Sequence, residues 1–177
     1  MPRYAAFLRA INLGKSRRVS GAELRELFEG LGFDEVASFR TSGNVVFETA
    51  KTAKLQERIE AALAKELGYE VGVYLRTDRQ LLALADERPF TPKQLDATQG
   101  KIQVDLLYRK PAKRVQDQVL ALSTADDLLA FGQRELYWLP RAGTMESDLD
   151  QEAIAKLLGP TTRRTKGTIE QLAAKYF

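Results

Sequence analysis

Residues 36–47 have the sequence VASFRTSGNVVF, and the order of apolar and turn-forming residues in this stretch predicts a β-hairpin. Apolar and polar side chains alternate along residues 36–40, which is typical of a strand with one buried face. Gly43 and Asn44 tolerate a positive φ angle, so they favour a tight turn. The apolar run at residues 45–47 then begins the returning strand.

The segments on either side of this hairpin extend it to the order βαββαβ. A short apolar strand is expected at residues 4–10. Ser20 and Glu23 have the spacing of a capping box, which predicts the start of a helix. A second amphipathic helix is expected at residues 55–67, followed by a strand at residues 71–75. This order is typical of the ferredoxin-like plait.

The second half of the chain repeats the same order after a connecting segment. We expect Asp78 to cap a connecting helix and residues 89–100 to form a loop. Strands are then expected at residues 102–108, 128–131, 136–139 and 161–164, and helices near residues 111–122, 151–158 and 169–176.

The sequence therefore predicts an α+β protein made of two tandem ferredoxin-like plaits plus a C-terminal helix. The first plait is assigned to residues 1–77, the connecting helix and loop to residues 78–100, and the second plait with the C-terminal helix to residues 101–177. A single larger α+β domain is the alternative architecture.

The composition excludes several classes of chemistry. The chain has no cysteine and no histidine, so thiol nucleophiles, disulfides, Cys-ligated zinc and histidine-based catalysis within one chain are excluded. An enzyme would have to use lysine, carboxylate or tyrosine side chains. Lys and Arg number 27 against 24 Asp and Glu, giving a net charge of +3. No stretch is apolar enough for a transmembrane helix, so we expect a cytoplasmic protein without a membrane partner.

Two local clusters of basic residues point to an anionic ligand. Residues 3–18 contain five basic side chains and no acid, and a second cluster lies at residues 163–166. Thr165 is expected to cap the last helix, leaving its first-turn amides facing those cations. Gly14-Lys15-Ser16 resembles the end of a P-loop, but the glycine required five residues earlier is replaced by Arg9, so a nucleotide-binding loop is rejected.

The candidate ligand-binding residues come from these clusters and from the hairpin. At the hairpin, a plain turn is the favoured interpretation, and a polar recognition cluster of Arg40, Ser42 and Asn44 is the alternative. For the two basic clusters, solvated surface charge is the favoured interpretation, and an anion-binding site is the alternative. The full set is Arg9, Asn12, Lys15, Arg17, Arg18, Arg40, Ser42, Asn44, Arg163, Arg164, Lys166 and Thr168.

No metal or cofactor is predicted. Glu146, Asp148 and Asp150 alternate in a way that could hold Mg²⁺ or Ca²⁺, but they lack the EF-hand pattern, and a helix-capping role is favoured for Asp148 or Asp150. Tyr137 and Trp138 should point to opposite faces of one strand. A structural role is favoured for both rings, and the alternative is that one lies in the core while the other is exposed for stacking.

Three stretches resemble the bacterial domain of unknown function family 1697: RYAAFLRAINLG at residues 3–14, LGF at residues 31–33 and TSGNVVF at residues 41–47. The family pattern has glycine where this chain has Ala10 and Lys15, and its C-terminal Asn-Trp-Asn-Thr differs from RTKGT at residues 164–168. The resemblance implies tandem α/β plaits, and it implies no activity and no catalytic residues.

We therefore expect a cytoplasmic protein that binds an anionic partner, either a phosphorylated metabolite or a nucleic acid. An enzyme using Lys, carboxylate or Tyr chemistry in a cleft between the plaits is one alternative. A module that self-associates through strand edges is another. The sequence leaves the oligomeric state open.

Overall fold

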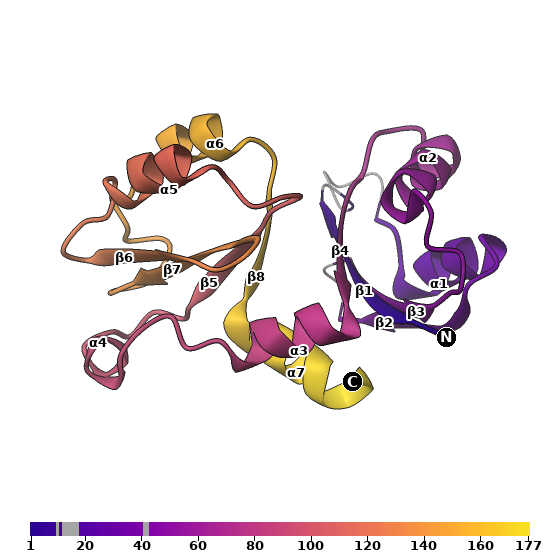
Figure 1. Cartoon of the computed structure of the whole chain (residues 1–177), viewed down its shortest axis with the longest axis horizontal. Helices are drawn as coiled ribbons and strands as arrows, with labels where there is room; N and C mark the ends of the chain where they lie inside the picture. Colours follow the sequence, from indigo (N-terminus) through magenta and orange to yellow (C-terminus); the bar gives the residue numbers. More distant parts are fainter. Residues whose placement is uncertain (10, 12–17, 41–42) are drawn as a thin grey trace. The chain divides into compact units, whose positions relative to one another are not determined.

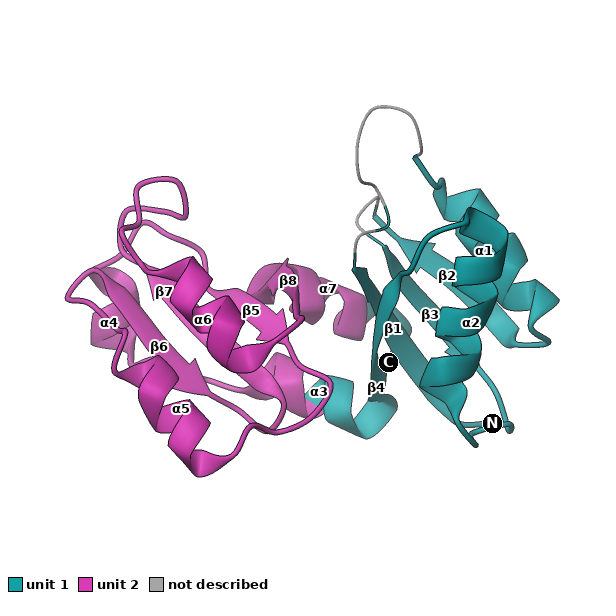
Figure 2. Ribbon diagram, turned by 90° about the horizontal axis from the view of Figure 1, so that it is seen from above, with its two compact units in different colours: residues 1–82, 175–177 teal, residues 83–174 magenta. Residues whose placement is uncertain are grey.

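The computed structural model describes residues 1–9, 11, 18–40 and 43–177, and they form two compact units (Figures 1 and 2). Unit 1 comprises Met1–Leu82 together with Lys175–Phe177, and unit 2 comprises Ala83–Ala174. The predicted domain limits at residues 77 and 101 stay a prediction.

Unit 1 is an antiparallel sheet covered by two helices on one face. Its sheet has the strand order β2-β3-β1-β4, and every neighbouring pair is antiparallel. The elements in chain order are β1 (Arg3–Arg9), α1 (Gly21–Gly30), β2 (Asp34–Phe39), β3 (Asn44–Glu48), α2 (Leu55–Leu67) and β4 (Gly72–Thr77).

The core of unit 1 forms between the sheet and its two helices. Phe47 on β3 stacks on Phe33, with ring centroids 4.5 Å apart. The Phe28 ring on α1 meets Phe47 edge-on at 5.3 Å. Alternate residues of β1, such as Ala6 and Leu8, point into the same cluster. These aromatic contacts attach α1 to the middle of the sheet.

Unit 2 has the same order of elements and an equivalent sheet. Its strand order is β6-β7-β5-β8, again antiparallel throughout, so the α+β class is confirmed. A helix, α3 (Asp78–Asp86), leads from unit 1 into unit 2. The other elements are α4 (Pro92–Asp96), β5 (Gln103–Leu106), α5 (Lys113–Leu120), β6 (Asp127–Phe131), β7 (Glu135–Pro140), α6 (Gln151–Leu158), β8 (Thr162–Thr165) and α7 (Lys166–Tyr176).

The core of unit 2 lies between β7 and the helices α5 and α6. Leu136 and Trp138 of β7 pack there with Val119 and Ile154. Tyr137 lies on the opposite face, yet it is as fully buried as Trp138. Both rings are therefore structural, as favoured from the sequence, because both faces of β7 are covered. The alternative that one ring is exposed for stacking is wrong.

Three of the four predicted helix caps are present, at the starts of α1, α6 and α7. Ser20 and Glu23 form the predicted capping box of α1. The Asp150 carboxylate accepts from the Ala153 N–H and caps α6, also as predicted. The prediction that Asp78 caps α3 is wrong. Thr77 does so instead, because its hydroxyl accepts from the Gln80 N–H at 3.3 Å while the Gln80 side chain accepts from the Thr77 N–H.

The expectation that residues 89–100 form only a loop is also wrong. The short helix α4 lies within this segment, and Thr91 and Gln94 form its capping box. Its five residues are too few to produce an apolar stripe that a periodicity search would detect. Among the described residues, no helix combines the length and apolarity needed to cross a membrane.

The predicted hairpin is present, and Gly43 has the positive φ angle that its turn requires, +72°. A Cβ atom at this position would lie 2.9 Å from the Ile11 Cγ2 and 3.1 Å from the Leu8 Cβ. Both the backbone angle and the close packing therefore demand glycine.

We expect Gly43→Val to lower the free energy of unfolding by at least about 1 kcal/mol, since it combines strain at positive φ with a clash. Gly30→Val is the matched control, because a Cβ there meets nothing within 4 Å. It should change stability by less than about 0.5 kcal/mol. Denaturant unfolding of both variants tests this, and equal losses would refute it.

The pH dependence of stability offers a second test at the start of α1. Hydrogen bonds from the backbone N–H and the side chain of Ser20 lower the pKa of Glu23 below its ordinary value of 4.5. A lowered carboxyl pKa stabilises the fold above the pKa of the unfolded state, and this contribution disappears as the pH falls through the folded pKa. Glu23→Gln should therefore destabilise the protein at pH 7 and have a smaller effect at an acid pH below the folded pKa, where Glu23 is protonated. An equal effect at both pH values would contradict the expectation.

Candidate functional site

The end of β1 and the turn of the β2–β3 hairpin lie side by side. The Leu8 N–H donates to the Gly43 carbonyl at 2.8 Å, which joins the two segments directly. Asn44 is buried, and its side-chain amide donates to the Phe39 carbonyl at 3.0 Å across the hairpin. One end of the unit 1 sheet is thereby built from two segments that are far apart in sequence.

The start of α1 belongs to the same end of the sheet. The Arg25 guanidinium donates to the Ser38 hydroxyl at 2.9 Å, and Ser38 lies one residue before the end of β2. Gly21 also lies against Ser38, because a Cβ on Gly21 would lie 2.6 Å from the Ser38 Oγ. Hence the first turn of α1 is next to the hairpin turn.

Four exposed arginines lie on these three segments, and we call them the arginine rim: Arg9, Arg18, Arg25 and Arg40. Arg9 ends β1, Arg18 precedes the Ser20 cap of α1, and Arg40 follows β2. Across the described ranges, the side chains of Arg9 and Arg18 make no hydrogen bond or ion pair. Two guanidinium groups of the rim are therefore without a partner among the described residues.

Sequence reasoning identified three members of the rim and missed the fourth. Arg25 is one of several charged residues on an amphipathic helix, and its position beside the hairpin depends on how α1 packs. Arg40 has a φ of +58°, and its guanidinium lies 5.5 Å from the centre of the Phe39 ring. Asn12, Lys15, Arg17 and Ser42 were also predicted as site residues, and they lie outside the described residues.

The second predicted basic cluster is arranged differently. Arg163 forms a two-pronged ion pair with Asp105, at 2.7 and 2.8 Å, and also donates to the Gln151 side chain. Its guanidinium lies 4.8 Å from the centre of the Trp138 ring. The Asp105 side chain is 5% exposed, so the charge of Arg163 neutralises a buried carboxylate.

Arg164 and Lys166 are also engaged within unit 2. Arg164 is buried, which lowers the pKa of its guanidinium to about 10, and it donates to the Thr162 hydroxyl at 2.9 Å. The Lys166 ammonium donates to the Ala85 carbonyl at 2.6 Å and pairs with Glu170 at 2.9 Å. These cations therefore do not surround the start of α7 as free charges.

Thr165 caps α7 as predicted, because its hydroxyl accepts from the Thr168 N–H at 3.2 Å. The Thr168 hydroxyl lies 2.9 Å from the Thr165 hydroxyl, so these two side chains are bonded to each other. The cap is confirmed, and it uses one of the amides that an anion would need.

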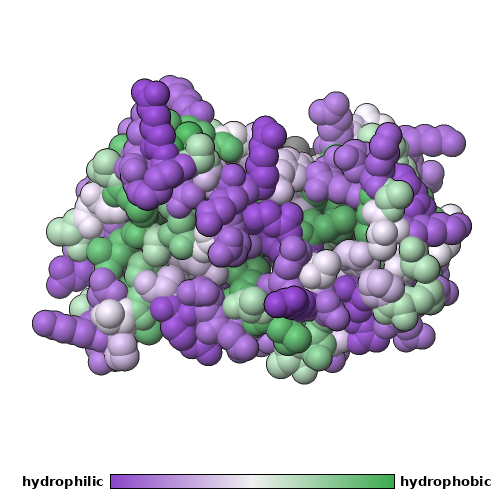
Figure 3. Space-filling model, in the orientation of Figure 1, coloured by the Kyte–Doolittle hydropathy of each residue, from purple (hydrophilic) through white to green (hydrophobic). Residues whose placement is uncertain are grey.

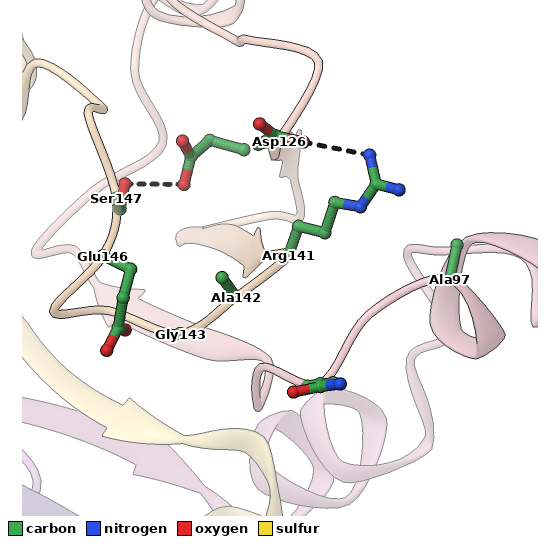
Figure 4. Close-up of a pocket in the computed structure, with 9 residues that line it drawn as sticks. Ala97, Asp126, Arg141, Ala142, Gly143, Glu146 and Ser147 are labelled. Carbon is green, nitrogen blue, oxygen red and sulfur yellow. Dashed lines mark hydrogen bonds and ion pairs between the residues drawn. The ribbon is translucent and has the colours of Figure 1, made fainter.

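Unit 2 also contains a hollow of about 520 Å³ beside the ends of β6 and β7 (Figure 4). Charged groups dominate its wall, and Asp126 pairs with Arg141 at 3.1 Å at its exposed rim. Glu146 folds back over Gly143 on the other side. The complete lining is Ala97, Gln99, Asp126, Asp127, Arg141, Ala142, Gly143, Glu146 and Ser147.

Asp127 is the buried carboxylate of this hollow, and three donors hold it. The Trp138 indole N–H and the Ser147 hydroxyl donate to one oxygen at 2.8 and 2.6 Å. The Thr124 hydroxyl donates to the other at 3.1 Å. Because its oxygens are already bonded, Asp127 fastens the loop after β7 to the sheet rather than reacting with a ligand.

Within the part of the chain that the structure describes, no group of three or more acidic residues is placed to hold a metal ion. Asp150, one of the alternating acids considered above, caps α6. Glu146 and Asp148 are exposed loop residues. The favoured capping role therefore holds for Asp150.

Each unit has the element order βαββαβ and forms one antiparallel four-stranded sheet. The chain is therefore an α+β protein built from two similar units. The family model described as "Protein of unknown function (DUF1697)" matches residues 1–137. The chain belongs to this family, as the resemblance in the sequence suggested. All the described residues of the arginine rim lie in the matched range, whereas residues 163–168 lie beyond it.

A solved structure of a conserved bacterial protein from Streptococcus pneumoniae is similar to the whole chain. It shares 23% sequence identity with a TM-score of 0.73, covering 98% of this chain and 97% of the other. At this identity the similarity establishes the fold alone. A search of curated proteins found no match.

The role of Asp127 leads to a test on two neighbouring residues. We expect Asp127→Ala to lower the free energy of unfolding by about 2–4 kcal/mol, since it leaves buried donors without an acceptor. Asp126→Ala is the matched control, because it removes the same charge from an exposed ion pair, whose loss costs about 1 kcal/mol at most. Thermal and denaturant unfolding measure both. Similar losses of stability in the two variants would show that Asp127 contributes no more to the free energy of unfolding than an exposed charge does.

Proposed function

We propose that this protein binds a phosphate-bearing ligand at the arginine rim. The observation that supports this most strongly is the position of Arg9 and Arg18, which are exposed, carry no intramolecular partner in the described ranges and lie on segments that meet at one end of the sheet. Arg25 and Arg40 add two further cations on the neighbouring segments.

The chemistry of arginine suits such a ligand. The planar guanidinium donates two parallel hydrogen bonds to phosphate oxygens, and such charge-assisted bonds are about twice as strong as neutral ones. Arg9 and Arg18 would contact an anionic group without first giving up an ion pair to any described residue. Arg163 has the same guanidinium group, but it would have to break its ion pair with Asp105 before it could bind a phosphate.

The ligand is either a phosphorylated metabolite or a nucleic acid. Both contain phosphate groups, and these are the groups that the arginine rim would bind. The net charge of +3 is modest for a nucleic-acid-binding protein, and this supports a small phosphorylated molecule as the first choice. The two ligand classes differ in salt dependence, because a nucleic acid releases many counterions on binding and a small anion releases few.

We further propose that both units are ferredoxin-like plaits. The support is the order βαββαβ with the central strands β1 and β3 in unit 1, and β5 and β7 in unit 2. Fold alone does not assign an activity, so an enzyme with Lys, carboxylate or Tyr chemistry between the plaits stays a prediction.

The test compares two double variants with equal loss of charge. Arg9→Ala with Arg18→Ala removes the two unpaired rim cations. Arg79→Ala with Arg114→Ala removes two exposed cations on α3 and α5. Binding of a nucleoside triphosphate and of a short single-stranded RNA is measured by calorimetry at low and moderate salt.

We expect the rim variant to bind at least about tenfold more weakly, which corresponds to about 1.4 kcal/mol, while the control binds like the unmodified protein. A steep salt dependence with RNA and weak triphosphate binding would identify a nucleic acid as the ligand. Equal losses in the two variants, or no binding of either probe, would overturn the proposal.

A further inference from the structure

The edge strand β6 of unit 2 has an unusual sequence for an exposed sheet edge. It pairs with β7 on one side and stands at the end of the sheet order. After Asp127 its residues are Leu128, Leu129, Ala130 and Phe131, all apolar and all half-buried. Figure 3 shows hydrophobic surface in the region where Figure 1 places β6.

The pairing with β7 determines which backbone groups of β6 face outward. The Gly132 N–H donates to the Glu135 carbonyl at 2.9 Å, and the Arg141 N–H donates to the Asp126 carbonyl at 2.7 Å. Because every second residue of an antiparallel strand bonds to the same neighbour, Ala130 also bonds to β7. Leu129 and Phe131 therefore turn their N–H and carbonyl groups away from β7, toward the free edge.

Two of the three other edge strands of the sheets, β2 and β8, carry protective features that β6 lacks. β2 has an irregular register between Asp34 and Ala37, and Glu35 has a φ of +48°. β8 carries Arg163 and Arg164 among its four residues. Bulges and charges of this kind prevent pairing between sheet edges. β6 has a continuous register and no charged side chain after its first residue.

We propose that β6 pairs with β6 of a second copy of this chain, antiparallel and centred on Ala130. In this register, Leu129 lies opposite Phe131 of the second copy, and Phe131 lies opposite its Leu129. The outward N–H and carbonyl groups of these residues then form four hydrogen bonds between the copies. The two sheets join into one continuous sheet across a two-fold axis.

The structure favours this register over one centred on Leu129. A register centred on Leu129 would require the Asp127 carbonyl as an acceptor for Phe131 of the second copy. That carbonyl already accepts from the Thr124 N–H at 3.0 Å. The register centred on Ala130 uses only the outward groups of Leu129 and Phe131.

The side chains also fit this arrangement. Residues facing each other at a non-hydrogen-bonded position come within about 4.5 Å between their Cα atoms. Ala130 occupies that position on the two-fold axis, and its small side chain permits the approach. Leu129 packs against Phe131 of the second copy, a favourable aliphatic–aromatic cross-strand pair.

A second copy is the occupant that these features support best, because the strand is complementary to itself. When the strand is reversed, the small Ala130 lies beside Ala130 of the second copy, and the aliphatic Leu129 lies beside the aromatic Phe131. A strand from another protein would need this same pattern. The proposal concerns unit 2 and does not depend on ligand binding at the arginine rim.

The first experiment measures the mass of the full chain in solution. Sedimentation equilibrium over a wide range of protein concentrations should show that the average mass rises from that of one chain to that of two. Ala130→Lys should abolish this rise, because two lysines would meet on the two-fold axis. Ala121→Lys is the matched control, an equal substitution at an exposed position just after α5, and it should dimerise like the unmodified chain.

The second experiment needs no variant and remains informative if Ala130→Lys fails to fold. Amide hydrogen exchange is measured at low and high concentration of the unmodified chain. The Leu129 and Phe131 amides should become protected as concentration rises, whereas the Ala130 amide, bonded to β7, should not change. The proposal would be overturned by a mass of one chain at every concentration. Amide exchange rates at Leu129 and Phe131 that do not change with protein concentration would also overturn it. A dimer that persists in a folded Ala130→Lys variant would do the same.

Discussion

The antiparallel pairing of β1 with β3 determines what unit 1 can present to a ligand. In its register Phe7 lies opposite Asn44, and the bond from the Leu8 N–H to the Gly43 carbonyl continues the ladder into the turn. This pairing brings the end of β1 to the hairpin, and α1 packs beside them. The arginine rim exists because these chain segments, although distant in sequence, meet at one end of the same sheet.

Unit 2 uses the same topology for a different purpose. The cations of its predicted basic cluster are engaged in internal contacts, as in the pairing of Arg163 with the buried Asp105. Its loop after β7 is fastened by Asp127, whose carboxylate accepts from three side chains. The feature it leaves open is the backbone edge of β6. Similar folds therefore expose side-chain charge in one unit and unpaired backbone in the other.

Local patterns predicted the elements that depend on neighbouring residues. The Ser20–Glu23 capping box, the positive φ of Gly43 and the Asp150 cap each arise from contacts within a few residues, so spacing alone indicates them. The same reasoning missed α4, whose five residues carry no periodic stripe. It also placed the cap of α3 one residue too late, because Thr77 and Asp78 are both good capping residues and only the backbone geometry decides between them.

The sequence by itself determined the α+β class, the order of the elements and the presence of local basic clusters, because helix and strand periodicity and charge are properties of short segments. Tertiary structure alone decided which of the charges are free. Asp105 is 58 residues from Arg163, and only the pairing of β5 with β8 brings them together. Likewise, whether Leu129 and Phe131 face a neighbour or an open edge follows from the position of β6 in the sheet. Partners that are distant in sequence meet only in space, so spacing along the chain does not encode their electrostatic and hydrogen-bond contacts.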